Sequence, residues 1–282
     1  MKKKFLATIC AAALLMVGCG GEKSSELAQD SGKATIGVIT RLNVSETEYN
    51  EYMKKLEKSY LPLKAHLSAN YKYFDKMNDM QLALESNQID ILSTYRNVAN
   101  YMLQRSDNKE ILPTEKILSD TFCFAVRESD IKLKNSLNRA IKSMIDDGKL
   151  ASLSKTYIVD IKNGAEPPAV PITKIEGADT IKVAVTGDLP PFDMVLADGT
   201  PAGFSTAVLA EISKRINKNI ELVSVDSAAR AAILASKGAD VVFWVAVPKD
   251  SILIPVNIDQ PVGIAITDPY YQDNIAHVGL KQ

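Results

Sequence analysis

The order of apolar and polar positions predicts short β-strands that alternate with amphipathic helices. Residues 35–40 and 180–185 are rich in β-branched residues, which is typical of strands. Within the stretch 205–216, apolar residues recur at helical spacing at Val208, Leu209, Ile212 and Ile216. Alternating strands and helices of this kind predict βαβ units, and therefore an α/β fold with mainly parallel sheets flanked by helices.

The same succession of elements occurs twice along the chain. The first copy is predicted as strand 35–40, helix 46–68, strand 71–74, helix 78–86 and strand 89–92. The second is predicted as strand 180–185, helix 205–216, strand 220–225, helix 228–236 and a strand from 239. Asp90-Ile91-Leu92 and Asp240-Val241-Val242 close segments of nearly equal length. We interpret the pattern as a duplication, with chance similarity between α/β segments as the alternative.

A proline-rich stretch separates the two copies. Residues 163–171 contain three prolines, which make a stiff, extended spacer. The predicted division is a first α/β unit at 34–162, a linker at 163–179 and a second α/β unit at 180–282.

The N-terminus has the features of an export signal. Three lysines at 2–4 precede an apolar run at 5–18, which is shorter than the roughly 20 residues that span a bilayer. Residues 1–18 are therefore predicted to be a signal peptide. Leu15 to Cys19 resembles a lipobox, although Met16 departs from the usual Leu, so Cys19 is predicted to carry lipid and residues 19–33 to form a flexible tether. The alternative is an ordinary secretory peptide with an incidental cysteine.

Composition excludes several classes of function. The formal net charge is −1, and it becomes −4 when the lysines at 2–4 are removed, so nucleic-acid binding has no electrostatic support. With Cys10 in the signal and Cys19 lipidated, only Cys123 remains, in an apolar run that favours a buried, inert thiol and allows no internal disulfide. The two histidines, His66 and His277, belong to no recognisable triad or metal site, so we expect no enzyme, metal or cofactor.

Five motifs of the second unit resemble the family-3 extracellular solute-binding proteins, which bind polar amino acids. In chain order the motifs lie at 181–192, 198–204, 214–216, 237–242 and 267–271. Residues 122–157 resemble the closing segment of the same family, in which the chain returns to the first lobe and ends on two helices. The resemblance implies two periplasmic-binding-protein-like lobes. The family order is first lobe, second lobe and return, whereas this chain is interpreted as two first-lobe-like units in tandem.

The resemblance also implies a ligand site. In the family, the first loop supplies an acid for the ligand ammonium and an aromatic ring, and here Asp188 and Phe192 hold those positions. Phe204 matches a second aromatic wall. The alternatives are that Asp188 is a turn residue and that both rings are core residues.

The strand after Asp240 departs from the family pattern. The hydroxyl residues and the arginine that grip the ligand carboxylate are missing, and Lys249 is the only nearby cation. Trp244 is expected to line an apolar pocket or to pack in the sheet.

Three arginines complete the list of candidates. Arg96, after the Asp90 strand, could supply the missing anion grip or be a solvated surface residue, and Arg41 follows the first strand. Arg230 is expected to make a surface or capping contact.

These residues together predict a binding protein of the cell envelope, anchored to the membrane by its N-terminal lipid. By resemblance it would deliver a small polar solute, an amino acid or a related compound, to the permease of an ABC importer. The alternative is a ligand-sensing or partner-binding lipoprotein with a degenerate binding-protein fold.

Overall fold

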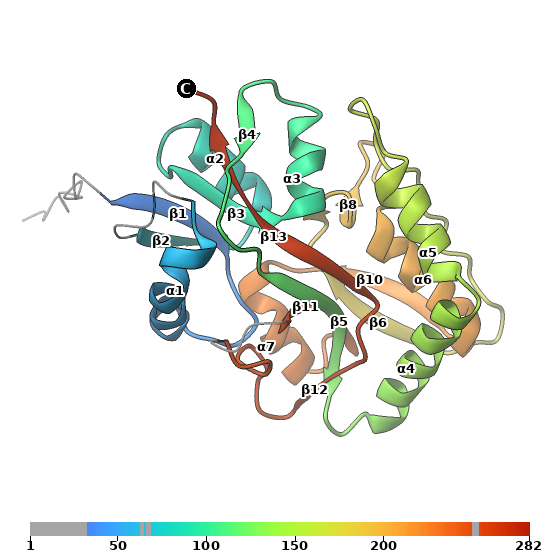
Figure 1. Cartoon of the computed structure of the whole chain (residues 1–282). Coiled ribbons are helices and arrows are strands. Elements are labelled where there is room, and N and C mark those ends of the chain that lie inside the picture. Colours follow the sequence, from blue (N-terminus) through green and yellow to red (C-terminus); the bar gives the residue numbers. More distant parts are fainter. Residues whose placement is uncertain (1–32, 63–64, 66–68, 250–253) are drawn as a thin grey trace, which may run out of the picture. The chain divides into compact units, whose positions relative to one another are not determined.

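The computed structural model describes residues 33–62, 65, 69–249 and 254–282, without the side chain of Trp244 (Figure 1). Residues 33–282 form one compact unit. The predicted signal peptide, Cys19 and all of the tether except Lys33 lie outside the described residues. No helix in the described part of the chain is both long enough and apolar enough to cross a membrane.

Two sets of three parallel strands form the framework, and we call them the first and second trio. In the first trio β1 lies between β2 and β3, and in the second β6 lies between β10 and β11. The first-trio strands are β1 (Ala34–Ile39), β2 (Ala69–Phe74) and β3 (Ile91–Tyr95), connected by α1 (Glu46–Tyr60) and α2 (Met77–Glu85). The second-trio strands are β6 (Thr180–Val185), β10 (Asn219–Ser224) and β11 (Val241–Lys249), connected by α6 (Phe204–Ile216), a 3-10 turn (Ser227–Ala229) and α7 (Arg230–Ala235).

The repeated aspartate makes the same contact in both trios. Asp90 accepts a hydrogen bond from the Thr35 N–H at 2.8 Å, and Asp240 accepts one from the Lys182 N–H at 2.9 Å. The Asp90 and Asp240 N–H groups donate in return to the carbonyls of the same two residues, each at 2.8 Å. In each copy this reciprocal pair ties the third strand to the first, which gives the sequence repeat a physical cause.

Two long antiparallel strands join the trios. These are β5 (Ser119–Arg127) and β13 (Tyr271–Leu280), which lie side by side at the centre of Figure 1 in green and red. β5 pairs with β11 and β13, and β13 continues along β3, giving the strand order β10-β6-β11-β5-β13-β3-β1-β2. Short strands β4 (Lys109–Ile111) and β12 (Ile264–Ile266) pair with β13 and β5 respectively. The predicted α/β class is confirmed, with parallel pairing inside each trio and antiparallel pairing between them.

The helices after β5 pack beside the second trio. α4 and α5 contact α6, and Arg215 of α6 binds Asp147 at 2.7 Å and Ser143 Oγ at 2.6 Å. α4 spans Ile131–Asp146 and α5 spans Lys149–Ser154, and a π-helical turn (Lys155–Val159) follows α5. The helix α3 (Arg96–Leu103) precedes β5 and directly follows β3. The segment that resembles the family's closing part therefore lies against residues that follow it in sequence. The predicted division at the 163–179 linker stays a prediction.

An aromatic cluster lies where β5, α6 and the start of β13 meet. Phe122 of β5 contacts Tyr270 and Tyr271, and Phe124 stacks on Tyr270. The ring of Phe204 lies tilted beside the same two tyrosines. Cys123, between the two phenylalanines, is 3% exposed, and burial raises the pKa of its thiol to about 12. The expected buried thiol is therefore what the structure shows.

The first loop of the second trio folds as a small antiparallel sheet. Its strands are β7 (Asp188–Leu189), β8 (Asp193–Val195) and β9 (Pro201–Ala202). The buried carboxylate of Asp193 accepts hydrogen bonds from the N–H groups of Thr186 and Gly187 at 3.1 and 2.8 Å. This ring of contacts fixes the position of Asp188.

Gly203, at the start of α6, has φ 104° and ψ 165°, a backbone region that is essentially restricted to glycine. A Cβ there would lie 2.5 Å from the Phe192 carbonyl oxygen, whereas Gly199, also at positive φ, has open space. We expect Gly203→Ala to lower the free energy of unfolding by about 3 kcal/mol and Gly199→Ala by about 1 kcal/mol, measured by urea denaturation. Equal losses in the two variants would contradict this account of α6.

Candidate functional site

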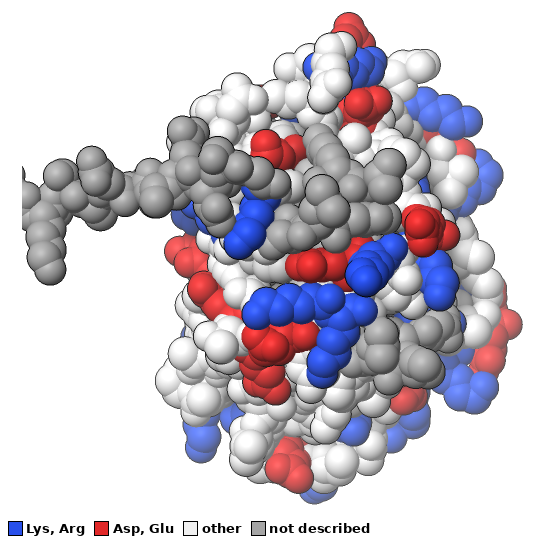
Figure 2. Space-filling model, turned by 60° about the vertical axis from the view of Figure 1, so that its left-hand side comes forward, with Lys and Arg blue, Asp and Glu red and all other residues white. Residues whose placement is uncertain are grey.

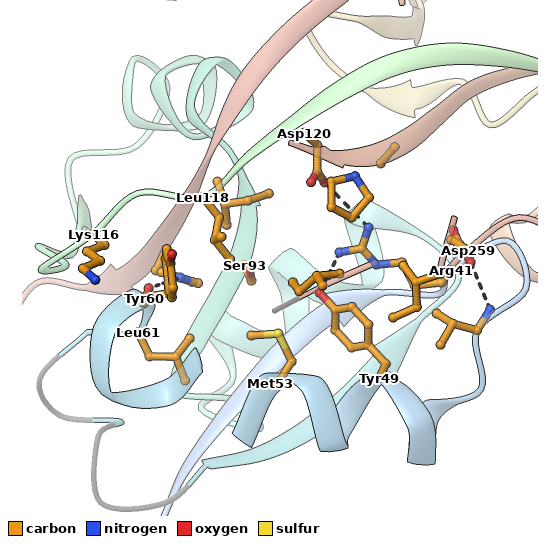
Figure 3. A pocket seen from close by; sticks show the side chains of 17 residues that line it. Arg41, Tyr49, Met53, Tyr60, Leu61, Ser93, Lys116, Leu118, Asp120 and Asp259 are labelled. Carbon is orange, nitrogen blue, oxygen red and sulfur yellow. Dashed lines mark hydrogen bonds and ion pairs between the residues drawn. The ribbon is translucent and has the colours of Figure 1, made fainter. Parts of the chain in front are cut away.

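A cleft lies where the carboxyl ends of strands from both trios meet, beside β5 and β13. Two adjoining cavities share the lining residues Arg41, Ser93, Ala246, Asp259 and Ile275. Each cavity has a volume of about 40 Å³, room for only about three water molecules. Figure 3 shows the first of them, with Arg41 between Tyr49 and Asp120. Strand ends of this kind are where open α/β sheets bind ligands.

Arg41 is a cation that lines both cavities of the cleft. One guanidinium nitrogen donates to the Tyr49 hydroxyl at 2.6 Å, and another lies 3.7 Å from Asp120 Oδ2. Burial acts to lower the pKa of Arg41, but the charges of Tyr49 and Asp120 outweigh it, and the pKa lies well above its ordinary value. Arg41 therefore stays charged and can bind a carboxylate with the same planar group.

Asp120 is the buried anion beside it. It is 5% exposed and accepts a hydrogen bond from the Tyr95 hydroxyl at 3.1 Å. Burial raises the pKa of Asp120, while the charge of Arg41 acts in the opposite direction. Together, Asp120 and Arg41 form one pair of opposite charges in the cleft.

Asp259 connects the two halves of the protein, by which we mean the part built around the first trio and the part built around the second trio. Its carboxylate accepts three hydrogen bonds from consecutive backbone N–H groups, those of Leu42, Asn43 and Val44, at 2.8, 2.6 and 3.0 Å. Asp259 follows β11 of the second trio, whereas these donors follow β1 of the first. A carboxylate that accepts several backbone hydrogen bonds is held strongly.

Arg230 makes a second bond between the halves. It is 3% exposed, and it donates to the Ser227 carbonyl at 3.1 Å and to the Thr40 carbonyl at 3.1 Å. The expectation of a surface or capping contact is wrong in its location, because the guanidinium reaches across the cleft and is enclosed by both halves.

Asp188 also lies between the halves. It accepts a hydrogen bond at 2.7 Å from the N–H of Met77, the first residue of α2. Burial raises the pKa of Asp188, and this hydrogen bond acts against the rise. A carboxylate at a helix N-terminus is favoured by the unpaired N–H groups there. In this structure Asp188 thus binds the opposite half of the protein, and its role toward a ligand stays a prediction.

Four other predicted site residues with described side chains do not line the two cavities. Phe192 and Phe204 are fully buried in the aromatic cluster, their rings 6.3 Å apart. Arg96 is half-buried at the start of α3, and Lys249 is exposed and donates to Gln272 at 2.6 Å. The side chain of Trp244 lies outside the described residues. The lining of the two cavities includes none of Phe192, Phe204, Arg96 and Lys249. The predicted roles of these residues and of Trp244 stay predictions.

Two buried polar side chains at the cleft are not among the site residues predicted from the sequence. Thr94 lines one cavity and His277 lines the other. Neither Thr94 Oγ1 nor His277 Nδ1 has a hydrogen-bond partner among the described residues. The other ring nitrogen of His277, Nε2, lies 3.2 Å from the carbonyl oxygen of Tyr60. Because a carbonyl oxygen can only accept a hydrogen bond, Nε2 carries the proton of the neutral ring. His277 sits within the apolar run of β13, which hides it from pattern analysis.

Surface charge and metal-binding groups add no further site. On the face drawn in Figure 2, Lys and Arg side chains lie among Asp and Glu side chains. Within the described residues, no group of three or more His, Cys, Asp or Glu side chains could hold a metal ion.

Residues 181–248 match the model of the bacterial extracellular solute-binding proteins, family 3. The resemblance predicted from the motifs is confirmed over this stretch. It supports a solute-binding role and an extracytoplasmic location. No curated protein sequence matched the chain.

Several solved structures are similar to this chain. One is the ligand-binding component of an ABC-type import system from Staphylococcus aureus, at 12% identity and a TM-score of 0.43, covering 87% of this chain and 65% of that one. Another is a cysteine-binding protein from Campylobacter jejuni, at 13% identity and a TM-score of 0.42, with 89% of this chain and 77% of that one covered. A third is a probable amino-acid ABC transporter extracellular-binding protein from Bacillus subtilis. Its identity to this chain is 10% and the TM-score is 0.42, with 89% of this chain and 84% of that one covered.

The buried imidazole of His277 makes the free energy of unfolding depend on pH. His277 is 4% exposed, and burial lowers its pKa to about 4, from about 6.5 when unfolded. Because the unfolded chain takes up a proton first, the stability due to this group is present above pH 6.5 and is lost as the pH falls to 4. We expect wild-type protein to lose about 3 kcal/mol more than His277→Gln between pH 7 and pH 4, measured by urea denaturation. Parallel losses would contradict the buried neutral imidazole.

Proposed function

We propose that this chain is a lipid-anchored extracytoplasmic protein that binds a small polar solute in the cleft at Arg41 and delivers it to an ABC importer. The observation that carries the proposal is the position of Arg41 and Asp120, opposite charges at the strand ends between two α/β halves, with Asp120 buried and Arg41 partly buried. The match of residues 181–248 to the solute-binding family supports the same reading.

The walls of the cleft suggest the chemistry of the solute. Arg41 suits a carboxylate or another anionic group, and Asp120 suits an ammonium. Apolar side chains lie beside them, those of Met53, Ile254 and Ile258. An amino acid or a related amphipathic compound combines these features.

Binding requires the cleft to open, because the two cavities hold only a few water molecules. Between the halves run the paired strands β5 and β13, which can act as a hinge, and the contacts of Asp188, Asp259 and Arg230, which must part. A solute then stabilises the closed state by its higher affinity for it.

A second candidate function is a sensor or partner-binding lipoprotein. It is favoured by the observation that two of the protein's own carboxylates, those of Asp188 and Asp259, connect the two halves. A stable protein partner found by crosslinking, together with no small-molecule ligand, would support it over the importer.

A thermal-shift screen of the chain from Gly20 onward, against amino acids, amines and organic acids, tests solute binding. A ligand at 100 times its dissociation constant should add roughly 2.7 kcal/mol to the free energy of unfolding. We expect Arg41→Met to abolish the shift and Arg105→Met, whose guanidinium stacks on Tyr101 at 3.4 Å outside the cleft, to keep it. No shift in folded wild-type protein with any compound would count against the proposal.

Lipid attachment is tested separately by palmitate labelling and membrane fractionation of the full chain. We expect Cys19→Ser to remove the label and release the protein, since Cys19 is the proposed acylation site. Cys10→Ser, within the predicted signal peptide, should leave the palmitate label and the membrane attachment unchanged. A labelled Cys19→Ser protein would show that the anchor lies elsewhere.

A further inference from the structure

The segment after β1 presents a cradle of backbone donors to the cleft. The N–H groups of Leu42, Asn43 and Val44 converge on one carboxylate, that of Asp259, within 3.0 Å. Successive N–H groups pointing into one concavity are a general anion-binding arrangement. The donors belong to the backbone, so their affinity for an anion does not depend on which molecule carries it.

Positive charge surrounds the cradle. Arg41 directly precedes it, and Arg230 donates to the carbonyl of Thr40 just before it. Both guanidinium groups line the cavity that Asp259 also lines. Burial acts to lower the pKa of both arginines, and the charge of Asp259 acts in the opposite direction on each, although the pKa of Arg230 is lowered overall.

Two buried polar atoms belong to residues that line the two cavities. Thr94, 6% exposed, lines the cavity with Arg230, and His277, 4% exposed, lines the cavity with Tyr49. Neither Thr94 Oγ1 nor His277 Nδ1 has a partner among the described residues. Buried polar atoms are normally hydrogen-bonded, so these two point to a polar occupant of the cleft.

Asp259 reaches the cradle from the other half of the protein. It is 5% exposed and stands more than two hundred residues from its donors, at sequence separations of 215 to 217. Its carboxylate is therefore an anion that the second half of the protein holds against these three donors.

We propose that the N–H groups of Leu42, Asn43 and Val44, with Arg41 and Arg230, form the carboxylate-binding site of the cleft, and that Asp259 occupies this site when no solute is bound. The inference rests on the proposed function, because it names the solute as a carboxylate. Two carboxylates cannot share three donors, so the solute must displace Asp259. Displacement frees the cradle from the second half. The apparent affinity for the solute is therefore the intrinsic affinity multiplied by the fraction of protein in which Asp259 has left the cradle.

Chemical rescue by acetate tests the inference without knowledge of the solute. Asp259→Ala empties the cradle, so sodium acetate should raise its Tm by about 4 °C more than sodium chloride at the same ionic strength. Wild-type protein, whose cradle is filled, should show no difference between the two salts. The control is Asp198→Ala, which removes an exposed carboxylate that accepts the Thr200 N–H at 2.9 Å outside the cleft, and acetate should not stabilise it specifically. Equal acetate effects on all three proteins would overturn the proposal.

A second variant keeps the test decisive if Asp259→Ala does not fold. Asp259→Asn preserves the side-chain volume and one acceptor, but it lacks the charge that competes with acetate. We expect acetate to shift the NMR signals of the Leu42, Asn43 and Val44 amides in this variant and not in wild-type protein. Unshifted amides in the variant would refute a carboxylate site.

The outcomes separate this inference from the function on which it rests. Acetate rescue in a protein that binds no compound of the solute screen would keep the carboxylate site and remove the importer role. Solute binding without rescue would keep the importer role and reduce Asp259 to a structural clamp.

Discussion

The antiparallel pairing of β5 with β13 is the constraint on which the rest of the structure depends. Phe122 pairs with Tyr271 and Asp120 with Asp273, and from this register β5 runs on along β11 while β13 runs on along β3. The two trios are thereby held with their strand ends at one cleft. In addition, β13 covers the edge of the first trio at β3 and β5 covers the edge of the second trio at β11, so the unpaired backbone groups of both edges are satisfied.

The same pairing explains why charge is gathered at the cleft. It places Asp120 at the centre of the protein, where a carboxylate is stable only with partners, and Arg41 and Tyr95 supply them. The other carboxylates of the cleft, Asp188 and Asp259, are satisfied by backbone N–H groups of the opposite half. The cleft is thus held closed by polar contacts, which open more readily than a packed apolar interface because water can replace each partner.

Local structure could be predicted from the sequence because its causes are local. β6 matches the predicted strand at 180–185, and α6 begins one residue before the predicted 205. The repeat around Asp90 and Asp240 reflects one hydrogen-bond pattern that both copies need. α1 differs more, since it ends at Tyr60 rather than continuing to 68, with Leu61 and Pro62 next in the chain. The residue before a proline is disfavoured in helices, so this end was readable.

The site could be predicted only in part, because its geometry depends on distant pairing. Asp188 was placed at the cleft by its motif, but its partner Met77 lies 111 residues away and no pattern connects the two. Asp259 has no local signal either, since its donors precede it by more than two hundred positions. Motif matching also could not place residues 122–157, whose β5 strand joins β11, because strand partners are chosen by the whole fold.

The central claim is that Asp188 and Asp259 hold the two halves together across the cleft. The most direct measurement is the distance between spin labels on Lys58→Cys of α1 and Ala235→Cys of α7, two exposed positions on opposite halves. In the solute-free protein we predict one narrow distribution, and with Asp188→Ala and Asp259→Ala combined we predict a broader one extending to longer distances. The same narrow distribution in both proteins would contradict the account, because the halves would then be held by the β5 and β13 strands alone.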